Sequence, residues 1–188
     1  APPFFLSIAR IIDMAIAGGI VLFAVATLRL QSRRRRKLPD VTLDAWRLGM
    51  ASLIACVAIW LSAQLWPAWA DSDAYPVLLG VLFIGGFAVS VVTGMLYKIV
   101  PFLAWFHLQS QLQAKAGTIP TMKDMIAERW MRAQFRLHLI ACMLLVGVPF
   151  LPQLGIAAGG VLTVSAVLLW VNLWSGVRRF TRHGGGSS

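Results

Sequence analysis

Apolar residues fill this chain in five long blocks, and no block alternates between apolar and polar positions. The polar stretches between the blocks are short except for Gln109 to Arg136. Each block is close to the ~20 residues that a helix needs to cross the hydrocarbon layer of a bilayer. Lipid offers the backbone no hydrogen bonds, so such blocks form helices or a closed barrel, and a barrel would show alternating segments of about 10 residues. The pattern therefore predicts an all-α, polytopic transmembrane helix bundle with about five spans. The expected spans cover residues 4–30, 46–70, 76–104, 137–151 and 154–177.

The composition agrees with a membrane protein. Of the 188 residues, 59% are hydrophobic and only 13% are charged, whereas soluble domains are about 45–50% apolar and about 25% charged. We expect a single transmembrane domain over residues 1–183. The sequence Gly184-Gly185-Gly186-Ser187-Ser188 is typical of a flexible tail or linker.

The net charge of +10 would suit a nucleic-acid partner, but its distribution argues against one. If the spans alternate in direction, 16 of the 17 Lys and Arg residues fall on one side of the membrane, and only Arg10 falls on the other. Such residues mark the cytoplasmic side, so we expect the N-terminus outside and the C-terminus in the cytoplasm. The residues expected to meet anionic headgroups are Arg33, Arg34, Arg35, Arg36, Lys37 and Lys98.

Small residues recur four apart in two blocks: Gly86, Ser90 and Gly94 in the third, and Gly155 and Gly159 in the fifth. Because small side chains let helices approach closely in lipid, both sets predict helix–helix contacts, within the chain or with a partner. A backbone pressed against a flat cofactor is the alternative. The two cysteines, Cys56 and Cys142, lie in different apolar blocks and are expected to be buried free thiols.

Ionisable residues inside spans are costly and are functional candidates. Arg10 and Asp13, three residues apart, are expected to neutralise each other. The alternatives are a polar partner in an upstream part of the protein or an anionic group such as a cofactor carboxylate. His107 and His138 fall at the same side of consecutive spans, and neutral imidazole is a common iron ligand. One interpretation places both at the interface without a cofactor; the other holds a haem b between them. In the second, its propionates meet the basic stripe formed by Arg129, Arg132 and Arg136.

The stretch from Gly94 to Leu108, GMLYKIVPFLAWFHL, resembles a group of bacterial membrane proteins similar to the NnrS family and, more distantly, to subunit I of haem-copper oxidases. The likeness covers the last three spans and, more loosely, the first two. It implies a protein of the bacterial inner membrane that is associated with haem, or with haem and copper, in respiration or nitric-oxide stress. The several spanning histidines of the oxidases are missing, which leaves only His107 and His138 as candidate ligands. The start at Ala1-Pro2-Pro3-Phe4 resembles an internal point of such proteins, so we expect the C-terminal half of a longer architecture.

Three functions follow as hypotheses. The first is a haem-associated, oxidase-like membrane protein. The second is a cofactor-free structural or assembly subunit that packs on partner helices. The third is half of a permease that needs an upstream half. The sequence shows no nucleotide-binding loop, hydrolase motif or pair of acidic residues deep in a span, and it leaves the question of enzymatic activity open.

Overall fold

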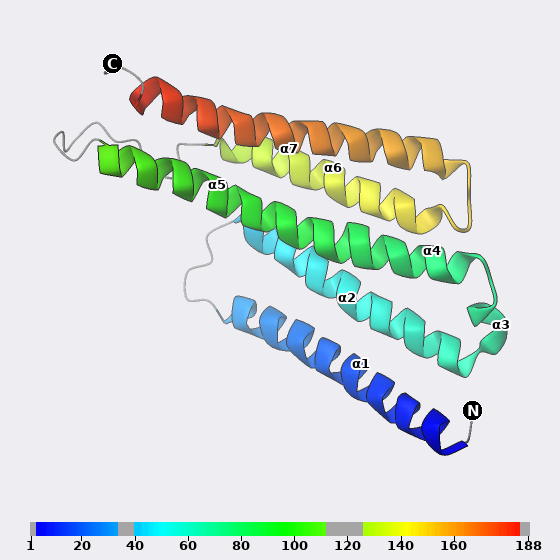
Figure 1. The fold of residues 1–188 in the computed structure, drawn as a ribbon. Helices are drawn as coiled ribbons and strands as arrows, with labels where there is room; N and C mark the ends of the chain where they lie inside the picture. Colours follow the sequence, from blue (N-terminus) through cyan, green and yellow to red (C-terminus); the bar gives the residue numbers. More distant parts are fainter. Residues whose placement is uncertain (1–2, 34–39, 112–125, 185–188) are drawn as a thin grey trace.

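The computed structural model describes residues 3–33, 40–111 and 126–184, and all regular secondary structure in these ranges is helical. The helices lie side by side and alternate in direction (Figure 1). In chain order they are α1 (Pro3–Ser32), α2 (Val41–Leu65), α3 (Pro67–Ala70), α4 (Ala74–Gly80), the π-helix η1 (Val81–Val89), α5 (Ser90–Gln111), α6 (Glu128–Gly147) and α7 (Leu154–Gly184).

Among the described residues, four helical segments are long and apolar enough to cross a membrane: Ile8–Ser32, Val41–Leu65, Ala74–Phe106 and Leu154–Arg178. The prediction of an all-α membrane protein is confirmed to this extent. The predicted fifth span falls on α6, whose 20 residues rise about 30 Å. Its first turns carry Glu128 and three arginines, so its composition does not mark it as membrane-spanning. It nevertheless runs antiparallel to α7 and packs closely along it.

The helix boundaries differ from the predicted spans for local reasons. The second helix begins at Val41, five residues early, because the side chain of Asp40 caps it by accepting a hydrogen bond from the backbone N–H of Thr42 at 3.0 Å. The same helix ends at Leu65, and the predicted stretch to residue 70 holds the separate short helix α3. Pro67 stands at the first position of α3, where a missing N–H costs nothing.

The third predicted span is part of one uninterrupted helical segment, α4–η1–α5, from Ala74 to Gln111. Pro101 lies inside α5 and does not end it. The fourth predicted span, 137–151, extends past the end of its helix, because α6 ends at Gly147 and the chain turns before α7. The helix also starts earlier, at Glu128, so the arginine stripe lies on it.

The bundle is centred on α2 and the α4–η1–α5 segment. α1 packs on the outer side of α2, while the α6–α7 hairpin packs on the other side, against η1 and α5. The apolar core between α1, α2 and this segment consists of Ala24, Met50 and Leu53, covered by Phe87 and Val91 among others. α1 is an edge helix: in its described part only Ala17 and Ala24 are fully buried.

The small-residue face of the third block lies at the closest contact of the bundle. A Cβ added to Gly86 would collide with the side chain of Ser52 on α2, and one on Gly94 would lie 3.2 Å from Cβ of Ala45. On the facing helix α2, Gly49 also allows this close contact, because a Cβ on it would stand 2.8 Å from Val91 Cγ2. By contrast, a Cβ on Gly155 or Gly159 would meet no described atom within 4 Å.

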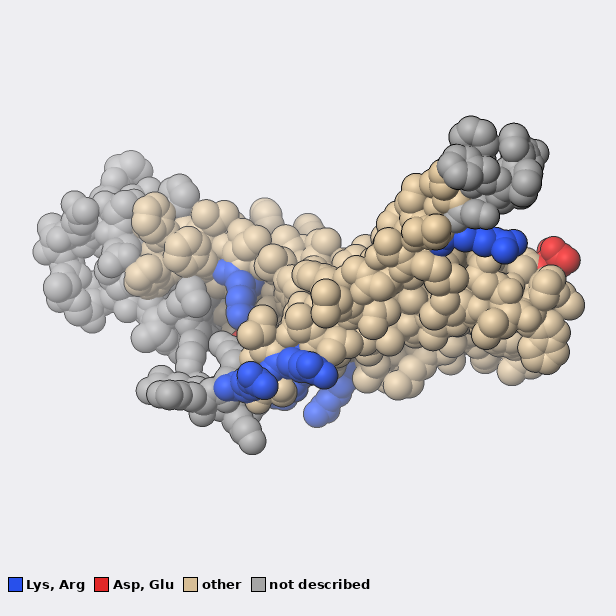
Figure 2. All heavy atoms as spheres, turned by 90° about the horizontal axis from the view of Figure 1, so that it is seen from below, with Lys and Arg blue, Asp and Glu red and all other residues tan. Residues whose placement is uncertain are grey.

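The described Lys and Arg residues other than Arg10 lie on the parts of the helices nearer one end of the bundle. Figure 2 shows basic atoms gathered over one part of the surface, with a smaller basic area near the opposite end. Within the basic end, Lys98 Nζ lies 3.4 Å from Asp40 Oδ2 and links α5 to the start of α2. Both side chains are partly exposed, so this ion pair contributes little stability.

Candidate functional site

Buried polar side chains gather where α5, α6 and α7 meet. We call the set of six the polar seam; each member is at most 6% exposed. Its members are Ser90, Tyr97, Gln134, His138, Ser165 and Asn172. They share one face of each helix, because Ser90 and Tyr97 are seven residues apart, as are Ser165 and Asn172, while Gln134 and His138 are four apart. Two clusters make up the seam.

The first cluster surrounds His138 on α6. The Nε2 atom of His138 lies 2.9 Å from Ser90 Oγ on α5 and 3.6 Å from Cys142 Sγ, one helical turn further along α6. The Cys142 thiol also donates to the backbone carbonyl of Gly85 in η1, at 3.7 Å. The imidazole therefore fastens α6 to the junction of η1 and α5, where the π-helix ends and the α-helix resumes.

The π-helix contributes to this cluster through its backbone. π-helical turns are rare and often occur at functional sites. Here η1 presents the carbonyl of Gly85 to the Cys142 thiol. On the opposite side of the same segment, the carbonyl of Leu79 accepts a hydrogen bond from the Cys56 thiol of α2 at 3.8 Å. Both free cysteines therefore bond to the α4–η1 backbone.

The second cluster joins three helices. The hydroxyl of Tyr97 donates to Gln134 Oε1 at 3.3 Å, and Gln134 Nε2 donates to Ser165 Oγ on α7 at 3.1 Å. Asn172 Nδ2 donates to the Tyr97 hydroxyl at 3.0 Å and to the carbonyl of Trp130 at 3.2 Å. In the part of the chain that the structure describes, Gln31 Oε1 is the one buried side-chain oxygen or nitrogen without a partner, so each fully buried nitrogen or oxygen of the seam has at least one hydrogen-bond partner.

The structure does not bring the two predicted haem ligands together. His138 touches Ser90, whereas His107 stands 17 residues further along α5. At 1.5 Å of rise per residue, about 25 Å of helix separates the two positions, and a single iron atom cannot bind both. The side chain of His107 lies outside the described residues. His138 is only 2% exposed and faces the interior of the bundle.

The arginines predicted for the haem propionates point away from His138. Nine residues separate Arg129 from His138, which places them on opposite sides of α6. Arg132 pairs with Glu128, with 3.0 Å between its Nε and the carboxylate, and the Arg129 guanidinium lies 5.6 Å from the centre of the Trp130 ring. Arg136 is exposed. The basic stripe is therefore a surface feature of the first turns of α6.

The predicted membrane-surface residues lie at the basic end or outside the described chain. Arg33 is exposed just after α1, and Lys98 pairs with Asp40. Arg34, Arg35, Arg36 and Lys37 lie outside the described residues. Arg10 and Asp13, expected to neutralise each other, form no ion pair with one another or with any other described residue. No group of three His, Cys, Asp or Glu side chains within the described ranges is placed to hold a metal ion.

Most residues of the polar seam were not predicted from the sequence. Gln134, Ser165, Asn172 and the hydroxyl of Tyr97 drew no attention because none of them carries a charge. Gln134 and Asn172 were nevertheless detectable, because an amide in an apolar helix must find a partner. Gln134 and His138, four residues apart, mark the inner face of α6.

Neither a scan against protein-family models nor searches of curated proteins and of solved structures find any match for this chain. The resemblance of residues 94–108 to NnrS-like and oxidase-like proteins therefore has no support beyond the sequence stretch itself and stays a prediction.

Proposed function

We propose that this chain is a structural or assembly subunit of a membrane complex, which holds its own helices together through the polar seam and packs against transmembrane helices of a partner. The observation that carries the proposal is the contrast between its two small-residue faces. Gly86 and Gly94 are covered by α2, whereas Gly155 and Gly159 on α7 are uncovered in the described chain. Small residues on a membrane helix favour close approach of another helix.

The exposure of the edge helices supports this proposal. In α1 and in α7, 11% of the most apolar 18-residue window is buried, against 33% in α2. The polar side chains of the bundle are engaged with one another, so the seam acts within the chain, and the outer surfaces of α1 and α7 remain to meet lipid or protein. A subunit that organises other helices needs such a pre-formed core with open flanks.

Leucine substitutions distinguish the two faces. Gly86→Leu should destabilise the isolated chain by about 1–3 kcal/mol, the usual cost of overpacking, because its side chain would collide with Ser52. The double change Gly155→Leu/Gly159→Leu should leave the stability of the isolated chain unchanged. It should, however, reduce the size of the complex extracted from native membranes in mild detergent. Thermal unfolding and native gel electrophoresis measure the two effects.

The control is Val164→Leu, an exposed position on α7 half a turn around the helix from Gly155. It should leave both readouts unchanged. An intact complex with the glycine double variant, or loss of stability in the isolated chain, would contradict the proposed role of this face.

The haem hypothesis gives a separate test. Because His107 and His138 are too far apart to share an iron, we expect no haem absorption band that depends on both histidines. A reduced-minus-oxidised optical spectrum of the purified chain, and of His107→Ala and His138→Ala, measures this. Loss of the same haem band in both single variants would support the haem-associated function and contradict the structural one.

We also propose that the basic end faces the cytoplasm of a bacterial cell and that the N-terminus faces outward. If the spans alternate in direction, 16 of the 17 Lys and Arg residues in the sequence fall on one side, and such residues mark the cytoplasmic side. A cysteine introduced at Ser72, in the turn before α4, should react with an impermeant thiol reagent added outside. One at Ser110, near the end of α5, should react only after the membrane is opened. Cys56 and Cys142 are buried and give little background. Labelling of position 110 from outside would contradict this orientation and indicate the opposite one.

A further inference from the structure

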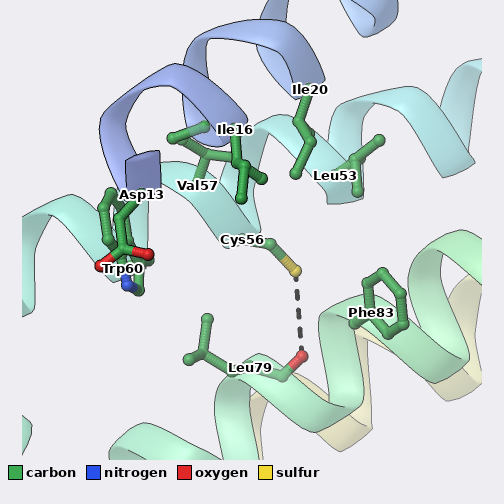
Figure 3. Close-up of a pocket in the computed structure, with 10 residues that line it drawn as sticks. Asp13, Ile16, Ile20, Leu53, Cys56, Val57, Trp60, Leu79 and Phe83 are labelled. Atoms are coloured by element: carbon green, nitrogen blue, oxygen red, sulfur yellow. Dashed lines mark hydrogen bonds between the residues drawn. The ribbon is translucent and has the colours of Figure 1, made fainter. Parts of the chain in front are cut away.

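A groove of about 400 Å³ runs between α1 and the α4–η1 segment, with α2 as its floor. Figure 3 shows side chains from all three elements directed toward it. The floor is formed by buried side chains, Leu53, Cys56 and Val57, and the rim by Ile16 and Phe83, which are 56% and 52% exposed. Small-molecule binding sites commonly have this size and a mostly apolar lining with a few polar groups.

The polarity of the groove changes along its length. Asp13 and Trp60 line one end, and Ile20 and Leu53 line the other. Seven residues separate Asp13 from Ile20 on α1, and seven separate Leu53 from Trp60 on the antiparallel α2. The groove therefore extends about 10 Å along the helix axes. Its polar end lies a few residues inside the bundle end opposite the basic one, where Trp side chains commonly sit at the headgroup layer.

The charges at the polar end are unsatisfied within the described chain. Asp13 forms no ion pair there, and neither does Arg10, one turn nearer the N-terminus of α1. A carboxylate beside an indole ring suits a cationic ammonium group, which binds both. Arg10 lies one turn beyond Asp13, away from the apolar end, and does not line the groove. The polar end therefore complements the ammonium group at the end of a lipid headgroup.

We propose that this groove binds one zwitterionic phospholipid with a primary ammonium headgroup, phosphatidylethanolamine. The ammonium meets Asp13 and Trp60, and one acyl chain lies along Ile16, Ile20 and Leu53. The site is independent of the small-residue face of α7.

Two physical arguments favour a lipid over other occupants. A transmembrane helix with its side chains is about 10–12 Å wide and does not fit a 400 Å³ groove closed beneath by α2. An empty groove would deprive its apolar lining of dispersion contacts, and water finds few polar partners there. An acyl chain fills a narrow apolar groove parallel to the membrane normal and brings its headgroup to the level of Asp13.

The test is lipid binding to the purified chain by native mass spectrometry, with phosphatidylethanolamine and phosphatidylglycerol titrated in separate series. The unmodified chain should retain one phosphatidylethanolamine with clear preference over phosphatidylglycerol. Asp13→Asn should weaken phosphatidylethanolamine binding about threefold to tenfold, as expected for one partly exposed charge contact, with no loss for phosphatidylglycerol. Ile16→Trp, which places a larger side chain in the groove from its rim, should weaken both.

Matched controls are Asp73→Asn, an exposed carboxylate in the turn before α4, and Ile11→Trp, on an exposed part of α1 that does not line the groove. Both should bind lipid as the unmodified chain does. Equal binding of the two lipids, or a preference for phosphatidylglycerol, would overturn the proposal. Insensitivity to both Asp13→Asn and Ile16→Trp would overturn it as well.

Discussion

Inside a bilayer, a polar side chain on a helix must find its partner on a neighbouring helix, because lipid offers none. In this chain, the side chains of the polar seam provide these partners for one another. His138 meets Ser90, Gln134 meets both Tyr97 and Ser165, and Asn172 reaches the Tyr97 hydroxyl. Each contact requires a fixed rotation and axial position of α5, α6 and α7. The hydrogen bonds therefore set the register of the half of the bundle that apolar packing alone would leave free to slide.

The other half of the bundle is held in a different way. Between α2 and the η1–α5 segment the contact depends on Gly49, Gly86 and Gly94, whose missing side chains let the backbones approach closely. The two modes meet at Ser90, the first residue after the π-helix, which lies between Gly86 and Gly94 in the same i, i+4 series and bonds to His138. One segment, α4–η1–α5, thus provides a close-packing face to α2 and a hydrogen-bonding face to α6.

The sequence predicted the helical class and the apolar segments because the lengths of the blocks respond directly to bilayer thickness. It also identified the Gly86, Ser90 and Gly94 series, since small residues at helical spacing have a clear physical reason in lipid. It could not predict the partners of these residues. Two glycine series with the same spacing look alike in sequence, although α2 covers one and no described residue covers Gly159 in the other. Only the packing order of the helices separates them.

His138 shows the same limit for the candidate site. Its position near the start of an apolar block suggested either an interfacial side chain or a haem ligand, and neither interpretation predicted that His138 lies beside Ser90 inside the bundle. The spacing of the arginines indicates a helix that starts before the apolar block, but it cannot show which neighbouring helix covers the opposite face. The π-helix was equally hidden, since residues 81–89 are apolar throughout and carry no signal for a change of hydrogen-bonding pattern.

The central claim is that hydrogen bonds of the polar seam hold α5 to α6, and a double-mutant cycle of Tyr97→Phe and Gln134→Leu tests it most directly. Both changes preserve size, and each leaves another bond to the remaining groups, from Asn172 to the Trp130 carbonyl and from Ser165 to the Gln134 carbonyl. Unfolding of the chain in detergent should give a coupling free energy of about 0.6 kcal/mol, the average measured for hydrogen bonds between membrane helices, and no more than about 1.7 kcal/mol, the largest value measured. Strictly additive effects of the two substitutions would contradict the claim.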